Sequence, residues 1–264
     1  MLFRSTDFRI GYYRDDFGGL ASVGGSAAAP IYSVMATVNN TNVNLNGVFI
    51  QNLNAGESYF FQASVIGSLL ETSKPCVVMS GQWGDAPGGC TDGVFTEVFP
   101  ISLADTSYVV VRGAGTVGTG TNLPERSTVI ATVANTVVTL RNYSNTGAFL
   151  STSTVTLVNP GSYTVFAHGD ANNIYSSTTI NADKKVVVFS GIAAGCENDF
   201  SMLPPLQLCS GSLNVQTFKF RRFDNSDLPF VGYVTVRSAT GIVFLNGVNI
   251  ETLAGSAEIG RAHV

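Results

Sequence analysis

Apolar and polar residues alternate along several short stretches of the chain, with turn residues between them. In residues 34–45 (VMATVNNTNVNL), Asn-Asn and Asn-Gly turn signals accompany this period of two. Tight turns in residues 53–61 and 158–166 use Gly to supply a positive φ. Two continuous apolar runs, PCVVMSG and KVVVFSG, are typical of strands buried on both faces. Because no segment shows a capped helical period, the pattern predicts an all-β fold.

These stretches recur with a period of about 100 residues, which indicates internal repeats. VMATVNNTNVNLNG returns as VIATVANTVVTLRN and again as YVTVRSATGIVFLNG, and KPCVVMSG returns as KKVVVFSG. Each unit has about six or seven expected strands, a number that suits a small β-sandwich. We therefore predict tandem β-sandwich-like repeats over residues 6–100 and 101–212, followed by a truncated third copy over residues 213–257.

The two ends of the chain differ in character from the repeats. MLFRS and EIGRAHV resemble the translation of a short-read sequencing adapter and of its reverse complement. Chance similarity is the alternative, but two matching ends favour the adapter. We expect residues 1–5 and 258–264 to be non-native, and flanking domains of a longer chain to be missing.

Composition narrows the functional classes. Hydrophobic residues make up 45% of the chain, which is enough to form a core, whereas charged residues make up only 12%. The net charge of −4 offers no basic surface, which argues against nucleic-acid binding. No apolar run reaches the roughly 18 residues of a membrane-spanning helix, so we predict no membrane span.

Four cysteines, Cys76, Cys90, Cys196 and Cys209, occur two to a repeat. Sequence alone allows three pairings. We favour Cys76–Cys90 and Cys196–Cys209, because each pair closes a short loop within its own repeat. Such disulfides would indicate an extracellular setting. The alternative is four buried free thiols.

Motifs with catalytic, cofactor or metal chemistry are incomplete. GAGTVG at residues 113–118 matches G-x-G-x-x-G, but the Gly- and Pro-containing segment after it does not predict the required helix. His168 stands near Asp170 without a nucleophile elbow. The loop acids Asp85, Asp92, Glu197 and Asp199 could bind calcium but lack a known ligand spacing, which favours solvated surface acids. We therefore predict no catalytic residue, cofactor or metal, and no enzyme.

Three other residues are candidates for surface chemistry. Trp83, the only tryptophan, lies in the Gly-rich loop GQWGDAPGG, where it could stack on a sugar or plug its own loop. Asn39 and Asn142 match the N-glycosylation pattern. In an Asn- and Thr-rich chain such matches also arise without a function.

The combination of LNAGESY, TSKPCVVMSG, DKKVVVFSG and CENDFSMLPPLQLC resembles the N-terminal domain of the mucus IgG Fc-binding protein and its bacterial relatives. The resemblance covers most of the chain, although the first repeat has EVFPI where a double proline is expected. It implies an extracellular β-rich module of large surface or mucus-layer proteins, and it supplies no catalytic residues. IgG binding itself does not transfer with the resemblance.

Two functional hypotheses follow. The first is a non-catalytic structural or adhesive module, located outside the cell or on its surface, with protein or glycan partners. The second is a glycan-binding module, accessory to an enzyme in missing flanking sequence. The second predicts exposed aromatic side chains grouped on one face.

Overall fold

The computed structural model describes twelve segments of the chain and consists almost entirely of β-strands. The described residues are 3–15, 30–62, 65–82, 94–111, 126–144, 148–167, 176–194, 197–206, 231–236, 241–245, 247–253 and 258–263.

Seven strands near the N-terminus form one antiparallel sheet, which we call the first repeat. They are β1 (Ser5–Arg9), β2 (Ile31–Ala36), β3 (Thr41–Leu45), β4 (Val48–Leu53), β5 (Ser58–Gln62), β6 (Leu69–Gln82) and β7 (Val94–Glu97). The strand order is β4-β3-β6-β2-β5, and β1 and β7 also pair with β6. A 3-10 turn, η2 (Ile101–Leu103), then leads into the next unit.

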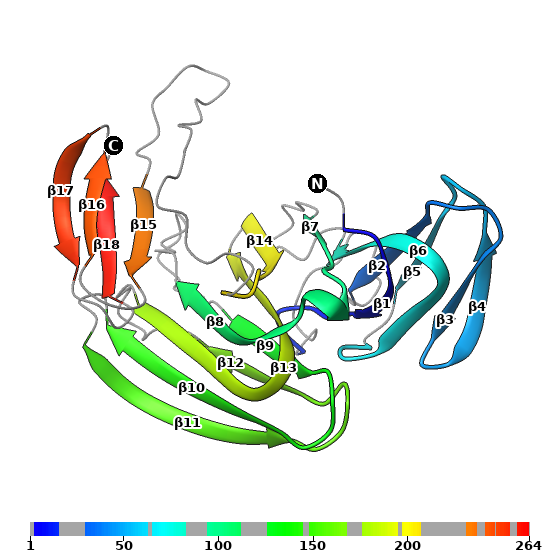
Figure 1. Ribbon diagram of the computed structural model, residues 1–264, viewed down its shortest axis with the longest axis horizontal. Helices are drawn as coiled ribbons and strands as arrows, with labels where there is room; N and C mark the ends of the chain where they lie inside the picture. The colour runs from blue at the N-terminus through cyan, green and yellow to red at the C-terminus, as the bar shows by residue number, and fades with distance from the viewer. Residues whose placement is uncertain are drawn as a thin grey trace.

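The second repeat has the same topology, strand for strand (Figure 1). Its strands are β8 (Asp105–Val111), β9 (Arg126–Ala131), β10 (Thr136–Ser144), β11 (Phe149–Leu157), β12 (Tyr163–Ala167), β13 (Ser176–Ala194) and β14 (Glu197–Met202). Their order is β11-β10-β13-β9-β12, and β8 and β14 also pair with β13. The predicted all-β fold of sandwich-like repeats is confirmed.

A third group of strands follows, made of two antiparallel pairs. β15 (Val231–Val236) pairs with β18 (Glu258–His263), and β16 (Gly241–Leu245) pairs with β17 (Val248–Leu253). Residues 258–263, expected from sequence to be non-native, thus form a strand, which leaves their origin untested. The repeat boundaries proposed from sequence stay predictions.

Each sheet curls because its longest strand bends (Figure 1). The first part of β6 pairs with β1 and β3, and its last part pairs with β2 and β7. β13 divides its partners in the same way. We call the concave side of each sheet, which carries Val34 and Val78 in the first repeat, the inner face, and the opposite side the outer face.

Turn chemistry is conserved between the two repeats in detail. Asn40 and Asn135 occupy equivalent turns with φ of 57° and 53°, a region that Asn tolerates better than most residues. In the same turns, the hydroxyls of Thr41 and Thr136 donate to backbone oxygens three residues earlier. Matching side-chain hydrogen bonds therefore fix the entry into the β3 and β10 strands.

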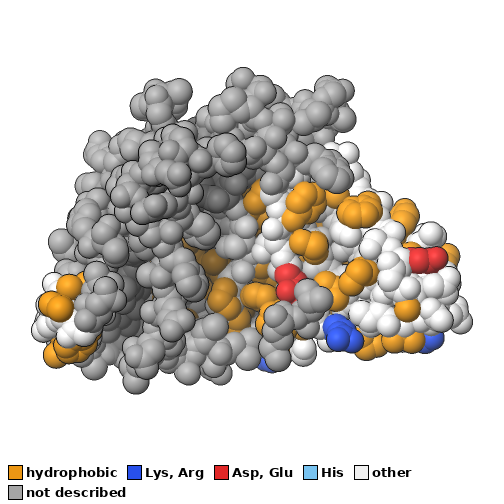
Figure 2. Space-filling view, turned by 90° about the horizontal axis from the view of Figure 1, so that it is seen from above, with side chains coloured by type: hydrophobic (Ala, Val, Ile, Leu, Met, Phe, Trp, Pro, Cys, Tyr) orange, Lys and Arg blue, Asp and Glu red, His pale blue; other side chains and the backbone are white. Residues whose placement is uncertain are grey.

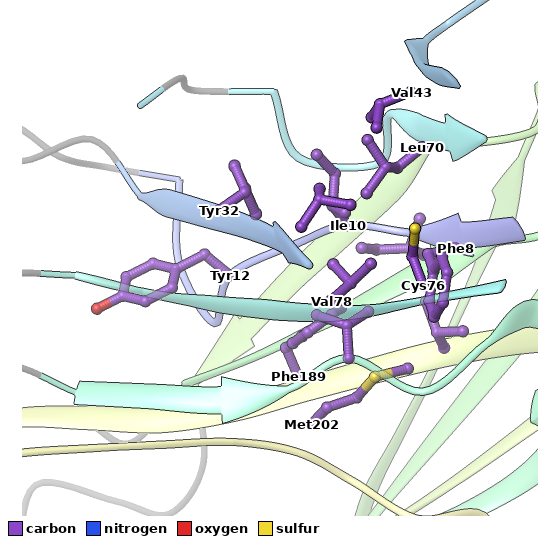
Figure 3. Packing of buried hydrophobic residues seen from close by; sticks show 14 of the residues in the cluster. Phe8, Ile10, Tyr12, Tyr32, Val43, Leu70, Cys76, Val78, Phe189 and Met202 are labelled. Atoms are coloured by element: carbon purple, nitrogen blue, oxygen red, sulfur yellow. The ribbon is translucent and has the colours of Figure 1, made fainter. Parts of the chain in front are cut away.

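The core of the first repeat extends into the second. Its inner-face residues, including Phe8, Tyr32, Val34, Cys76 and Val78, form one buried cluster with Ile130, Val187, Phe189, Phe200 and Met202. Figure 3 shows Val78 directed toward Met202 and Phe189, which come from the neighbouring sheet. A second cluster lies on the inner face of the second repeat. The two repeats therefore share a core, in which the inner face of the first sheet packs on the outer face of the second sheet.

The chain after β1 approaches the second sheet so closely that one position requires glycine. A Cβ atom on Gly11 would lie 2.6 Å from Cδ1 of Ile130 and 2.7 Å from Cε2 of Phe189. Next to it, the rings of Tyr12 and Phe200 pack with centroids 4.6 Å apart. Complete burial of side chains such as Ile130 and Phe189 stabilises the folded state by about 1.5–3 kcal/mol each.

A second contact between the repeats is made by two glycine turns. Gly67 and Gly161 have φ of 86° and 84°, and their backbones meet so closely that a Cβ on either would overlap the other's carbonyl oxygen. Arg9, which is buried, donates from Nη1 to the Gly67 carbonyl at 3.1 Å. Only glycine fits both the backbone conformation and the space.

We predict that Gly67→Ala destabilises the protein by about 3 kcal/mol or more, because positive φ and overlap with Gly161 act together. Gly56→Ala is the matched control, since Gly56 has φ of 84° but nothing within 4 Å of a built Cβ. Its cost should be about 1–2 kcal/mol. Urea unfolding of both variants checks this, and equal costs would show that the contact between the two turns contributes nothing.

Candidate interaction surfaces

The outer side of the β3–β4 hairpin carries a cluster of uncharged amides. The exposed Asn52 donates from Nδ2 to Oδ1 of Asn40 at 2.9 Å and to Oδ1 of Asn42 at 2.7 Å. Asn42 and Asn52 are direct cross-strand partners. We call Asn40, Asn42 and Asn52 the amide cluster. Its mutual hydrogen bonds hold the amides in place and leave an uncharged polar surface.

The equivalent surface of the second repeat is made of hydroxyls. On the β10–β11 hairpin, Thr139 lies opposite Thr154, and their Oγ1 atoms are 3.5 Å apart. Ser151, Thr152, Ser153 and Thr154 are all exposed on β11. The two repeats therefore present the same sheet geometry with different polar groups.

Exposed apolar side chains accompany these hairpins. Phe49 on β4 is 58% exposed, and Phe149 at the start of β11 is also 58% exposed. Others are Val48, Phe60, Leu150, Ile242, Phe244 and Val248. Figure 2 shows several groups of apolar side chains and few charged ones on the described surface of the first-repeat end. Among the described residues, the exposed aromatic side chains are distributed over Phe49 and Phe60 in the first repeat, Phe149 and Tyr163 in the second, and Phe244 on β16.

Four tyrosines serve the cores of the two repeats. Tyr12, Tyr13, Tyr32 and Tyr108 are among the largest fully buried side chains. The Tyr12 hydroxyl donates to Oε1 of Gln82 at 3.0 Å, and the Tyr108 hydroxyl donates to the Val186 carbonyl at 2.6 Å. Burial raises the pKa of Tyr32 and of Tyr108 above the ordinary value. These rings are unavailable for stacking on a sugar.

Several residues proposed from sequence lie outside the described residues: Trp83, Asp85, Cys90, Asp92, His168, Asp170, Cys196 and Cys209, as do the GAGTVG motif and the side chains of Glu197 and Asp199. Their roles stay predictions. Among the residues that the structure does describe, no three His, Cys, Asp or Glu side chains gather in a group that could hold a metal ion.

The two candidate glycosylation sites differ in environment. Asn39 is exposed in the β2–β3 turn, where its Oδ1 accepts from the Ala55 amide at 2.9 Å. Asn142 is half-buried on β10, and its Nδ2 donates to Oγ of Ser151 while its Oδ1 accepts from Oγ1 of Thr178. Asn39 is the more accessible acceptor, and modification of either residue stays a prediction.

Cys76 is a free cysteine in the structure and is fully buried on the inner face of β6. Burial raises the pKa of its thiol, and a hydrogen bond with Thr72 opposes that shift. This environment agrees with the alternative of buried free thiols. Because Cys90 lies outside the described residues, the Cys76–Cys90 pairing stays a prediction, and so does Cys196–Cys209.

The amide cluster and the shared core were not predicted from sequence. The signal for the cluster was present in TNVNLNG, where Asn recurs at every second position and therefore on one side of the strand. No comparable signal marks Gly11 or Ile130, because their role depends on contact between two repeats.

Together, the duplicated sheets define the class of this protein as a tandem all-β repeat module. The family model described as IgGFc binding protein matches residues 22–253, which is more than half of the chain. The chain belongs to the IgGFc binding protein family. This is a family of non-enzymatic binding domains that are typically extracellular.

Other comparisons add little. No curated protein sequence matches the chain. A calcium-binding mutant of Bacteroides uniformis β-glucuronidase 2 is similar at 11% identity and a TM-score of 0.15, with 67% of this chain and 24% of that structure covered. The chain thus spans about a quarter of that protein, and the likeness carries no argument. Within the described part of the chain, no helix has the length and apolar character of a membrane span.

We predict that iodoacetamide added without reductant modifies Cys76 only after unfolding, because the thiol is buried and its pKa is raised. Peptide mapping by mass spectrometry checks this in native and urea-unfolded protein. Recovery of a peptide pair linked by Cys76 and Cys90 would contradict the prediction and restore the pairing proposed from spacing.

Proposed function

We propose that the chain is a non-catalytic structural and adhesive module of an extracellular protein. The observation that carries the proposal is the shared core, because it couples consecutive repeats through buried contacts instead of a flexible linker. Such coupling suits a module that holds the binding surfaces of consecutive repeats at a constant distance from one another. Membership in a family of binding domains supports the same role.

The surfaces available for adhesion are uncharged and polar. The amide cluster and the hydroxyl-rich β11 strand can donate and accept hydrogen bonds without the ionic-strength dependence of charged surfaces. Exposed Phe49 and Phe149 add apolar contact area on the same two hairpins. These features suit a protein partner, in which polar and aromatic groups are contacted together.

A glycan-binding function is the second candidate, and the amide cluster favours it. Fixed amide groups are well suited to pair with sugar hydroxyls, and Phe49 could pack on a sugar ring. The burial of Tyr12, Tyr13 and Tyr32 weighs against it, because these rings are unavailable for stacking on a sugar.

The two candidates can be separated with one binding experiment. The chain is immobilised, and mucus glycoproteins, the same glycoproteins after enzymatic deglycosylation, and IgG Fc fragments are passed over it. The proposed adhesive function predicts binding to the glycoproteins that survives deglycosylation. Binding that disappears on deglycosylation would instead establish the glycan function.

We predict that Asn52→Ala weakens partner binding about three- to ten-fold, because Asn52 organises the amide cluster and such a hydrogen-bonding group contributes about 0.5–1.5 kcal/mol. Ser201→Ala on β14, outside both hairpins, is the control for loss of an exposed polar group. Equal effects of the two variants, or none, would exclude the amide cluster as the binding surface.

A further inference from the structure

The outer faces of the two equivalent sheets differ in exposure. In the second repeat, Ile130, Val187 and Phe189 on this face are completely buried, because the first repeat packs over them. In the first repeat, Met35 on β2 pairs with Val77 on β6. In the second repeat, Ile130 on β9 pairs with Val187 on β13, so Met35 and Val77 are the equivalents of Ile130 and Val187. Met79 occupies the position of Phe189, and it is 38% exposed.

The exposed face continues beyond Met79. Gly81 pairs with Phe95 as Gly191 pairs with Phe200, so Phe95 is the equivalent of Phe200. Phe95 and Met35 are half-buried, and Phe60 on the neighbouring β5 strand is 55% exposed. We call Met35, Phe60, Met79 and Phe95 the outer apolar face of the first repeat. Val77 lies on the same side of β6 but is buried. An apolar surface of this kind marks a site of association.

We propose that this face is the docking site of a further copy of the repeat, which precedes the first repeat in the same polypeptide. The contact would reproduce the one between the first and second repeats, with the inner face of the added copy covering Met35, Phe60 and Met79. It extends the structural role proposed above, and it needs no adhesive ligand.

The chemistry of the face fits this occupant. In the existing contact, Gly11 and Tyr12 of one repeat lie on Ile130, Phe189 and Phe200 of the next. Methionine is flexible and adapts to irregular surfaces, so Met35 and Met79 can accept the same backbone approach with little rearrangement. Glu97 stands at the edge of the face in place of Met202, and its Oε1 accepts a hydrogen bond from the Phe3 amide at 2.6 Å.

The register also specifies how the copy is joined. Ser5 pairs with Cys76 as Asp105 pairs with Val186, so Ser5 and Asp105 are equivalent starting points. The test protein is therefore residues 1–104 followed directly by residues 5–264. Met35 and Met79 of the added copy are replaced by Leu, so that the original Met79 is identified by its own peptide.

Methionine oxidation by hydrogen peroxide, followed by peptide mass spectrometry, measures exposure of the face. In the parent chain we expect Met79 to oxidise rapidly and Met202, which is 4% exposed, to oxidise slowly. In the extended chain the original Met79 should oxidise at least five-fold more slowly. Unchanged oxidation of Met79 in the extended chain would overturn the proposal.

Two controls make the result specific. Gly11→Trp in the added copy alone should block the contact and restore the oxidation rate of the original Met79, and continued protection would show that tethering alone shields it. In the parent chain, the oxidation rate should be independent of protein concentration. Concentration-dependent protection of Met79 that is lost in Phe60→Glu would assign the face to a second chain and overturn the proposal.

A stability measurement gives an independent readout. Met79→Glu should leave the urea midpoint of the parent chain nearly unchanged, because the position is exposed. In the extended chain the same substitution of the original Met79 should lower the midpoint clearly. Equal effects in both chains would contradict docking at this face. Glycoprotein binding is measured separately, so failure of either proposal leaves the other intact.

Discussion

Packing of the chain segment after β1 on the outer face of the second sheet is the interaction on which the rest of the structure depends. Gly11 allows the backbone to reach Ile130 and Phe189, and Tyr12 then packs beside Phe200. Without this approach, the inner face of the first repeat would lose the apolar surface that completes its core. The packing density of protein interiors explains why one methyl group at Gly11 is excluded.

The shared core explains how a chain with few charges can hold consecutive repeats in a fixed arrangement. Each repeat closes one side of its neighbour, and the hairpins that carry the amide cluster and the hydroxyl-rich strand project away from the contact. The polar groups on these hairpins are therefore free to vary between repeats while the packing stays the same. The different polar groups on β4 and β11 show such variation on two sheets of the same topology.

The sequence predicted the strands and the repeat well, because alternation, Asn-Gly turns and glycine at positive φ are local signals. It predicted burial less well. PCVVMSG and KVVVFSG read alike, yet Phe189 is fully buried and its equivalent Met79 is exposed. That difference comes from the neighbouring repeat. For the same reason Gly11 is inconspicuous in the sequence, since Val111 stands at the equivalent position of the second repeat. The loop residues Trp83 and Cys90 lie outside the described residues and stay predictions.

Hydrogen exchange measured on Phe189→Ala tests the shared core most directly. Loss of this buried ring should destabilise the protein by about 3–5 kcal/mol, and protection should fall together in β2 of the first repeat and β9 of the second. Phe149→Ala, which removes the same group from an exposed position, should change stability by no more than about 0.5 kcal/mol. Loss of protection in β9 alone, with β2 unchanged, would show that the repeats fold independently and would contradict the account.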